Sequence, residues 1–174
     1  TIERKTLDWN HERFDELIDY TFSEGKYKDE IHKTDGLLIL KDGKIVYERY
    51  KNGYNQTSRH MLWSFSKSLA NGIMGAAEYQ GILKRDQKLI EYFPQLKEKE
   101  WGDELTLKHL MNMSSGFDFH EENPNSIVFS NSIYLQYAWR GYKDMAGYVL
   151  EKNLKFRPGT EFSYNTGDAV LSMA

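Results

Sequence analysis

A serine and a lysine three residues apart are the first candidates for chemistry in this sequence. They stand in Ser64-Phe65-Ser66-Lys67, at the start of a segment rich in apolar and small residues. On a helix, side chains at positions i and i+3 share a face, so the hydroxyl and the amine can meet. A lysine with a lowered pKa can take the proton of a serine hydroxyl and make it a nucleophile. The first turn of a helix would add backbone N–H groups that favour developing negative charge.

The spacing alone also has a simpler explanation. Serine often caps helices and lysine is common on surfaces, so a capping Ser64 and a solvated Lys67 stay open as alternatives. The same spacing recurs at Ser23-Glu24-Gly25-Lys26, but that match lies in a polar stretch with a helix-disfavouring glycine, and we discount it. The choice therefore depends on what else the chain contains.

The first sixty residues predict a helix and then a β-hairpin. Apolar residues recur at helical spacing over residues 7–22, with acidic residues on the other face. A polar stretch, residues 23–35, follows. Two apolar runs, 36–40 and 44–50, then flank Lys41-Asp42-Gly43. Asp-Gly between two such runs is a strong hairpin signal, because glycine adopts a positive φ without steric cost.

Residues 64–79 predict a helix that Gly81 ends. Leu69, Ile73 and Met74 fall on one side of this helix. Several glycines and alanines along its length predict close packing against neighbouring elements.

The rest of the chain predicts more helix. Residues 106–113 fit a short helix with a capping residue at its start and Gly116 just beyond its end. Residues 127–154 form an aromatic, mostly helical stretch, 158–159 a turn, and 167–174 a further apolar segment. We find no repeat, linker or low-complexity tract.

Composition excludes several classes of protein. The 174 residues carry a net charge of −3, so the basic face expected of a nucleic-acid-binding protein is absent. No apolar stretch approaches the roughly 20 residues of a membrane helix. The lack of cysteine excludes disulfides, thiolate zinc sites and thiol nucleophiles. Because the first residue is Thr1, we expect a processed or cut chain whose targeting signal is out of view.

Other polar residues are weaker candidates. His120-Glu121-Glu122 offers three possible metal ligands in a row, but it lacks the i, i+4 histidine pair of a metalloprotease helix. We therefore expect a solvated loop there and no metal. His60 and His109 are expected to be structural, although His60 is near Ser64 in sequence.

Three further segments join the serine–lysine tetrad in a recognisable order. They are Leu-Thr-Leu-Lys-His-Leu-Met-Asn-Met-Ser-Ser-Gly at 105–116, Phe-Arg-Pro-Gly-Thr-Glu-Phe-Ser-Tyr at 156–164, and the hairpin at 36–50. Together they resemble the serine beta-lactamase-related superfamily, which includes class C beta-lactamases, D,D-peptidases, related esterases and 6-aminohexanoate-dimer hydrolases. The resemblance implies an α+β fold, with an antiparallel sheet flanked by helices, a mostly helical lobe, and the active site between them.

The resemblance also implies roles for individual residues. Ser64 matches the acylated nucleophile, and Lys67 the lysine beside it. Tyr164 matches the tyrosine of a Tyr-x-Asn motif, which moves a proton between the nucleophile and the leaving group. That role requires a nearby cation, since an unperturbed phenol has a pKa of about 10. The simpler alternative for Tyr164 is packing at the edge of a core.

Two features depart from the family pattern. Thr166 occupies the motif's asparagine position and Asn165 lies one place early; we predict that both contact substrate, and the exchange argues against beta-lactam substrates. The family's Lys-Thr-Gly motif, on a strand that supplies an oxyanion N–H, does not occur in these residues.

We therefore expect residues 1–174 to be the N-terminal portion of one serine hydrolase domain. Residues 1–60 would give the N-terminal helix and hairpin of the α/β part, residues 61–174 the mostly helical lobe, and the C-terminal strands would be absent. The missing C-terminal segment or a second copy of the chain are the expected protein partners.

The predicted function is a serine hydrolase that acts through an acyl-enzyme on an amide or ester, with no metal or organic cofactor. Its substrate would be a small molecule or peptide, namely a beta-lactam, a D-peptide, an amide or an ester. The alternatives are a non-catalytic ligand-binding or sensor domain and an inactive fragment. The resemblance also implies an extracytoplasmic location.

Overall fold

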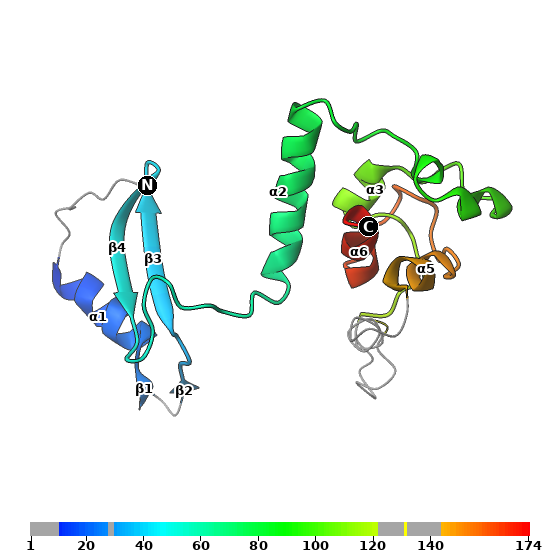
Figure 1. Cartoon of the computed structure of the whole chain (residues 1–174). Helices are drawn as coiled ribbons and strands as arrows, with labels where there is room; N and C mark the ends of the chain where they lie inside the picture. The colour runs from blue at the N-terminus through cyan, green and yellow to red at the C-terminus, as the bar shows by residue number, and fades with distance from the viewer. Residues whose placement is uncertain (1–10, 28–29, 122–130, 132–143) are drawn as a thin grey trace. The chain divides into compact units, whose positions relative to one another are not determined.

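The computed structural model describes residues 11–27, 30–121, 131 and 144–174. The chain divides into two compact units, Thr1–Met61 and Leu62–Ala174. The first unit combines a helix with antiparallel strands, and the second is mostly helical (Figure 1). Each unit is described by itself below.

The predicted hairpin is confirmed in the first unit. Strands β3 (Gly36–Lys41) and β4 (Lys44–Tyr50) pair antiparallel and are joined by two residues. Asp42 has φ 52° and Gly43 φ 72°. Positive φ at both central residues is the type I′ turn, whose twist matches that of the flanking strands.

Helix α1 (His11–Thr21) packs against this hairpin through side chains of β4. The Phe14 and Tyr47 rings meet edge to face with centroids 5.1 Å apart. Arg49 donates a hydrogen bond from Nη1 to Asp19 Oδ1 at 3.0 Å. These contacts confirm the predicted amphipathic helix over its described part, and residues 7–10 lie outside the described residues.

The polar stretch after α1 contains secondary structure that the sequence pattern did not predict. Strands β1 (Glu24–Tyr27) and β2 (Glu30–Ile31) pair antiparallel as a second, short sheet. These strands have only four and two residues, and their sequences lack the alternation of apolar and polar residues by which a strand is recognised. Backbone pairing does not require that alternation.

Helix α2 (Phe65–Tyr79) opens the second unit and ends as predicted. Gly81 has φ 73°, its N–H donates to the carbonyl of Glu78, and the N–H of Ile82 donates to Ala77, both at 2.9 Å. This is a Schellman ending, in which a left-handed residue after the helix satisfies its last carbonyls.

The packed side of α2 differs from the prediction. Ala70 and Met74 are buried, whereas Leu69 is 47% and Ile73 58% exposed. A Cβ atom at Gly72 would meet nothing within 4 Å, so the predicted close packing of small residues is wrong there.

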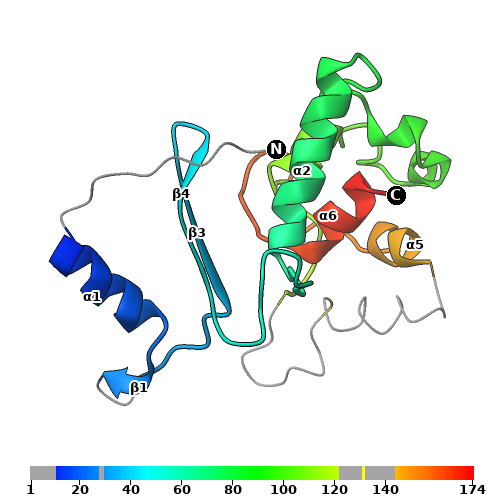
Figure 2. The same ribbon diagram turned by 60° about the vertical axis from the view of Figure 1, so that its left-hand side comes forward.

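Helix α6 (Thr166–Ser172) organises the second unit, because it contacts α2, α3 (Leu107–Met111) and α5 (Met145–Leu150). Figure 2 shows α6 beside α2, with α5 close to it. The predicted helical stretch 127–154 lies mostly outside the described residues, but α5 falls within it. The buried core comprises Met74, Leu89, Leu96, Leu105, Leu107, Leu110, Phe117, Phe119, Val149, Leu150 and Leu171.

Two short 3₁₀ helices connect α2 to α3. They span Leu89–Glu91 and Pro94–Glu98. Leu89 and Leu96 are buried in the core, so the connection between α2 and α3 is partly internal. Among the helices that the structure describes, none is long and apolar enough to cross a membrane.

A ladder of backbone hydrogen bonds joins the loop after α3 to the segment before α6. The donor and acceptor pairs are Asp118 N with Asn153 O, Lys155 N with Gly116 O, Gly159 N with Ser114 O, and Ser163 N with Met113 O. Their lengths are 2.7–2.8 Å. Gly116 has φ 84°, and a Cβ atom there would lie 2.1 Å from the Phe156 carbonyl oxygen. Only glycine lets the two backbones approach this closely.

Two glycine substitutions test this packing against a matched control. Gly81 and Gly116 both have positive φ, but a Cβ atom at Gly81 would meet nothing within 4 Å. We expect Gly81→Ala to cost about 1 kcal/mol of unfolding free energy from the left-handed backbone alone. Gly116→Ala adds a backbone clash and should cost more than about 3 kcal/mol. Urea unfolding followed by circular dichroism measures both, and equal losses would contradict the predicted close approach.

Candidate active site

Ser64 and Lys67 lie at the start of α2, with Ser64 at the N-cap position. Lys67 Nζ is 3.1 Å from Ser64 Oγ and donates to it, as the i, i+3 spacing predicts. Ser64 has φ −66° and ψ −13°, and within the described part of the chain its hydroxyl makes no helix-capping hydrogen bond. The hydroxyl is directed to the lysine, so the geometry does not support the capping alternative.

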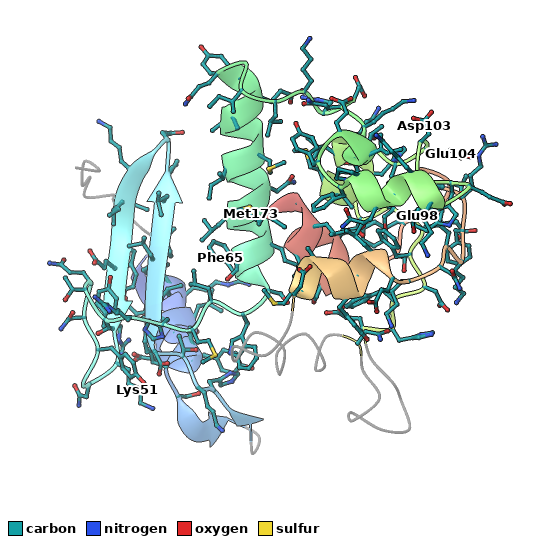
Figure 3. All side chains as sticks on the ribbon, turned by 45° about the vertical axis from the view of Figure 1, so that its right-hand side comes forward. Lys51, Phe65, Glu98, Asp103, Glu104 and Met173 are labelled. Atoms are coloured by element: carbon teal, nitrogen blue, oxygen red, sulfur yellow. The ribbon has the colours of Figure 1, made fainter. Side chains whose placement is uncertain are left out.

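Three backbone N–H groups at the start of α2 are already hydrogen-bonded within the chain. Each N–H group of Phe65, Ser66 and Lys67 donates a hydrogen bond, 3.0 Å long, to the carbonyl of the residue three positions earlier in the chain. Trp63, just before the nucleophile candidate, has φ 47°, which sets up this tight turn. Phe65, labelled at the N-terminal end of α2 in Figure 3, is 60% exposed.

Tyr164 is brought to the same place from a hundred residues later in the chain. Lys67 Nζ lies 5.0 Å from the centroid of the Tyr164 ring. Burial raises the pKa of the Tyr164 phenol, but hydrogen bonds with Lys67 and Ser64, together with the lysine charge, lower it more. The resulting pKa is below the ordinary value of 10, as a proton-transferring phenol requires.

One cavity of about 240 Å³ receives all three side chains. Ser64, Lys67 and Tyr164 line it together with apolar side chains that include Met113 and Phe162. Polar groups that converge in a largely apolar pocket are typical of a small-molecule site.

Asn165 is not in this cavity. Its side chain is 1% exposed and caps α6, because Oδ1 accepts the Asp168 N–H at 2.7 Å and Nδ2 donates to the Ser163 carbonyl at 3.0 Å. Both ends of the amide are therefore occupied within the chain. The structure gives Asn165 a capping role and does not support the predicted substrate contact.

Thr166 is held by Glu121 across 45 residues of sequence. Its N–H donates to Glu121 Oε2 at 2.8 Å, and its hydroxyl donates to Glu121 Oε1. Thr166 lines a second cavity of about 480 Å³, which shares Lys67 with the first. Glu121, which we expected in a solvated loop, therefore binds Thr166 through both carboxylate oxygens. No sequence pattern around Glu121 indicated this contact.

A buried carboxyl lies four residues after Tyr164. Asp168 is 0% exposed and accepts hydrogen bonds from Ser115 Oγ at 2.5 Å and from the Ser115 N–H at 3.4 Å. Burial raises its pKa to about 7, although the hydrogen bonds from Ser115 and the contact with Asn165 act in the opposite direction. Sequence reasoning missed this residue, because nothing in the residues next to Asp168 shows that its side chain is buried.

The histidines have local partners. His109 Nδ1 accepts the Thr106 N–H at 3.3 Å in the capping box of α3, and burial lowers the pKa of His109. In the first unit, His60 stacks on Tyr54 with ring centroids 5.1 Å apart. Among the described residues, no group of three metal-ligating side chains occurs, and Glu122 lies outside the described residues.

Comparison with known protein families shows which family the chain belongs to. The sequence model of the Beta-lactamase family matches residues 29–174, which is more than half of the chain. The chain belongs to the Beta-lactamase family. The resemblance found in the sequence motifs is thereby confirmed.

Individual relatives agree with this family assignment. The 6-aminohexanoate-dimer hydrolase of Paenarthrobacter ureafaciens is 30% identical over 113 residues, which are 64% of this chain and 28% of that protein. A Bacillus anthracis structure provisionally assigned as a 6-aminohexanoate-dimer hydrolase has a TM-score of 0.67 at 23% identity, over 98% of this chain and 46% of that one. A Bacteroides dorei structure provisionally assigned as a beta-lactamase has a TM-score of 0.67 at 17% identity, over 95% of this chain and 45% of that one.

The two solved structures show the fold, and they confirm the predicted α+β beta-lactamase-like class. This Beta-lactamase-family chain spans less than half of each solved structure and less than a third of the hydrolase relative.

Removing the lysine charge should raise the pKa of Tyr164. In Lys67→Met the phenol loses its largest favourable partner, while the burial that raises its pKa stays. The ¹³Cζ chemical shift of labelled tyrosine, assigned with Tyr164→Phe, reports that pKa. Lys84→Met, at an exposed position, should leave it unchanged. A Tyr164 pKa that is the same in both variants would show that Lys67 does not tune the phenol.

The buried Asp168 should make the second unit less stable as pH rises. Its folded pKa of about 7 exceeds the ordinary 3.8, so between these values the folded state binds more protons than the unfolded state. The stability is fully present below the lower value and falls by a few kcal/mol as pH rises to the upper one. Urea unfolding across this range should give a flatter profile for Asp168→Asn and the wild-type slope for exposed Asp86→Asn. The same slope in all three proteins would refute the buried-acid assignment.

Proposed function

We propose that this chain carries the acylation machinery of a serine hydrolase that cleaves an amide or ester. The observation that supports this most strongly is the 3.1 Å distance from Lys67 Nζ to Ser64 Oγ, with Tyr164 on the same cavity. A nucleophile within hydrogen-bond reach of a base, and a second proton-transfer group beside both, is the arrangement that acyl-enzyme chemistry needs.

The reaction would proceed in two stages. In the first, Ser64 Oγ bonds to the substrate carbonyl carbon while its proton passes to the Lys67 amine or the Tyr164 phenolate. Collapse of the tetrahedral adduct breaks the carbon–nitrogen or carbon–oxygen bond, and the leaving group takes up that proton. In the second, water attacks the acyl-serine and gives a proton to the same pair. Collapse of this adduct breaks the bond between the acyl carbon and Ser64 Oγ, which takes that proton back as the acid leaves.

The substrate that the observations favour is a small linear amide. The curated relative is named for the 6-aminohexanoate dimer, whose two halves are joined by an amide bond. Thr166 stands where beta-lactamases carry an asparagine, and its hydroxyl is held by Glu121, so no side-chain amide is presented there. Beta-lactams and D-peptides are the weaker candidates, and the extracytoplasmic location stays a prediction from the family.

Covalent labelling tests the nucleophile directly. We expect one fluorophosphonate adduct per chain by intact mass, lost in Ser64→Ala and kept in Ser66→Ala, which alters a neighbouring serine on the same helix. Lys67→Met and Tyr164→Phe should slow labelling by roughly 10²–10⁴-fold, since each removes a proton-transfer group. Exposed Lys84→Met and Tyr79→Phe serve as matched controls.

The outcomes separate the proposal from its alternative. Release of acid from 6-aminohexanoate dimer or a nitrophenyl ester over many turnovers would support the hydrolase. A stable adduct without turnover would favour the ligand-binding or sensor domain. Persistence of the adduct in Ser64→Ala, or its absence from the wild-type chain, would contradict the assignment of Ser64.

A further inference from the structure

The buried pair formed by Ser115 and Asp168 is not part of the chemistry proposed above. Both residues are 0% exposed. A carboxyl in the core is costly unless it is hydrogen-bonded, and an apolar side chain there would avoid that cost. The carboxyl of Asp168 accepts two hydrogen bonds from Ser115, and such a pair of bonds fixes the position of one segment relative to the other.

The segments that this pair joins are the loop after α3 and the first turn of α6. Ser115 lies within the loop that forms the backbone ladder, and Asp168 is three residues after the capping Asn165. On the other side of Tyr164, the Ser163 N–H donates to the Met113 carbonyl at 2.8 Å. Tyr164 therefore lies between two anchors that attach to the same loop.

Asn165 connects these anchors to each other. Its Nδ2 donates to the Ser163 carbonyl, and its Oδ1 accepts the Asp168 N–H. The backbone on both sides of Tyr164 is thus tied, while Tyr164 itself is 42% exposed. These backbone anchors therefore help to set where the phenol lies.

We propose that Asp168 is a positioning residue, which through Ser115 holds the Tyr164 segment where the phenol reaches Lys67 and Ser64. The inference rests on the proposed function for its catalytic consequence, but the placement of the phenol can be measured without turnover. The hydrogen bond from Ser115 Oγ, at 2.5 Å, is the contact on which it depends.

Asp168→Ala and Ser115→Ala remove the two sides of this contact, and Asp168→Asn keeps an oxygen that can accept from the Ser115 hydroxyl. We expect both alanine variants to raise the Tyr164 pKa toward 10, as read from the ¹³Cζ shift, and to slow fluorophosphonate labelling by up to about 100-fold. Asp168→Asn should keep a low Tyr164 pKa and recover most of the labelling rate. Ser115→Ala serves if Asp168→Ala does not fold.

The control is Leu171→Ala, which opens a hole one turn later on the same helix at a residue 2% exposed. It should lower stability without moving the Tyr164 pKa. The proposal is overturned if Leu171→Ala moves that pKa as far as Asp168→Ala does, or if neither alanine variant of the pair moves it.

Labelling tests the proposed function and the Tyr164 pKa tests the positioning role, so either one can be contradicted without the other. If the wild-type chain shows no labelling but the Tyr164 pKa responds to Asp168→Ala and not to Leu171→Ala, the proposed function is wrong and the positioning role stands. If labelling occurs at Ser64 and the Tyr164 pKa ignores the pair, the function stands and the positioning role is wrong.

Discussion

The candidate site depends on the contact between the loop after α3 and the segment that leads into α6. Ser64 and Lys67 are one helical turn apart, so α2 alone sets their distance. Tyr164 is a hundred residues after Ser64 in the sequence. The ladder of backbone hydrogen bonds, from Asp118–Asn153 to Met113–Ser163, holds its segment beside the loop after α3. That ladder closes only because Gly116 leaves no Cβ atom against the Phe156 carbonyl. A local pair becomes a three-residue site through this one close approach.

The features that sequence reasoning predicted are those that short-range geometry decides. The Asp42-Gly43 turn requires positive φ at two adjacent positions, and few dipeptides other than Asp-Gly and Asn-Gly supply it. The end of α2 at Gly81 follows from the same preference. The Ser64–Lys67 contact needs only that residues 64–67 be helical. In each case the information lies within a few residues.

The features that sequence reasoning missed are contacts between distant residues, and the choice of which face of a helix is buried. Asn165 offers the same amide to a substrate or to a helix terminus, and only the packing of α6 shows that it caps. Glu121 meets Thr166 across 45 residues, which no local pattern encodes. The apolar residues of α2 indicate a helix, but Leu69 and Ile73 are exposed while Ala70 is buried, because residue type does not say which face meets a partner.

Asp168 and Tyr164, two acidic groups near α6, are both affected by burial, but their pKa values shift in opposite directions. The hydrogen bonds of Asp168 with Ser115 and Asn165 lower its pKa less than burial raises it, so burial dominates and favours the neutral acid. Burial acts on Tyr164 in the same direction, but Lys67 and Ser64 outweigh it and favour the phenolate. A neutral carboxyl can hold a backbone in place without disturbing the charges at the site, whereas a phenol that exchanges protons must stay beside the cation. Two groups whose pKa values shift in opposite directions therefore stand four residues apart around the start of α6.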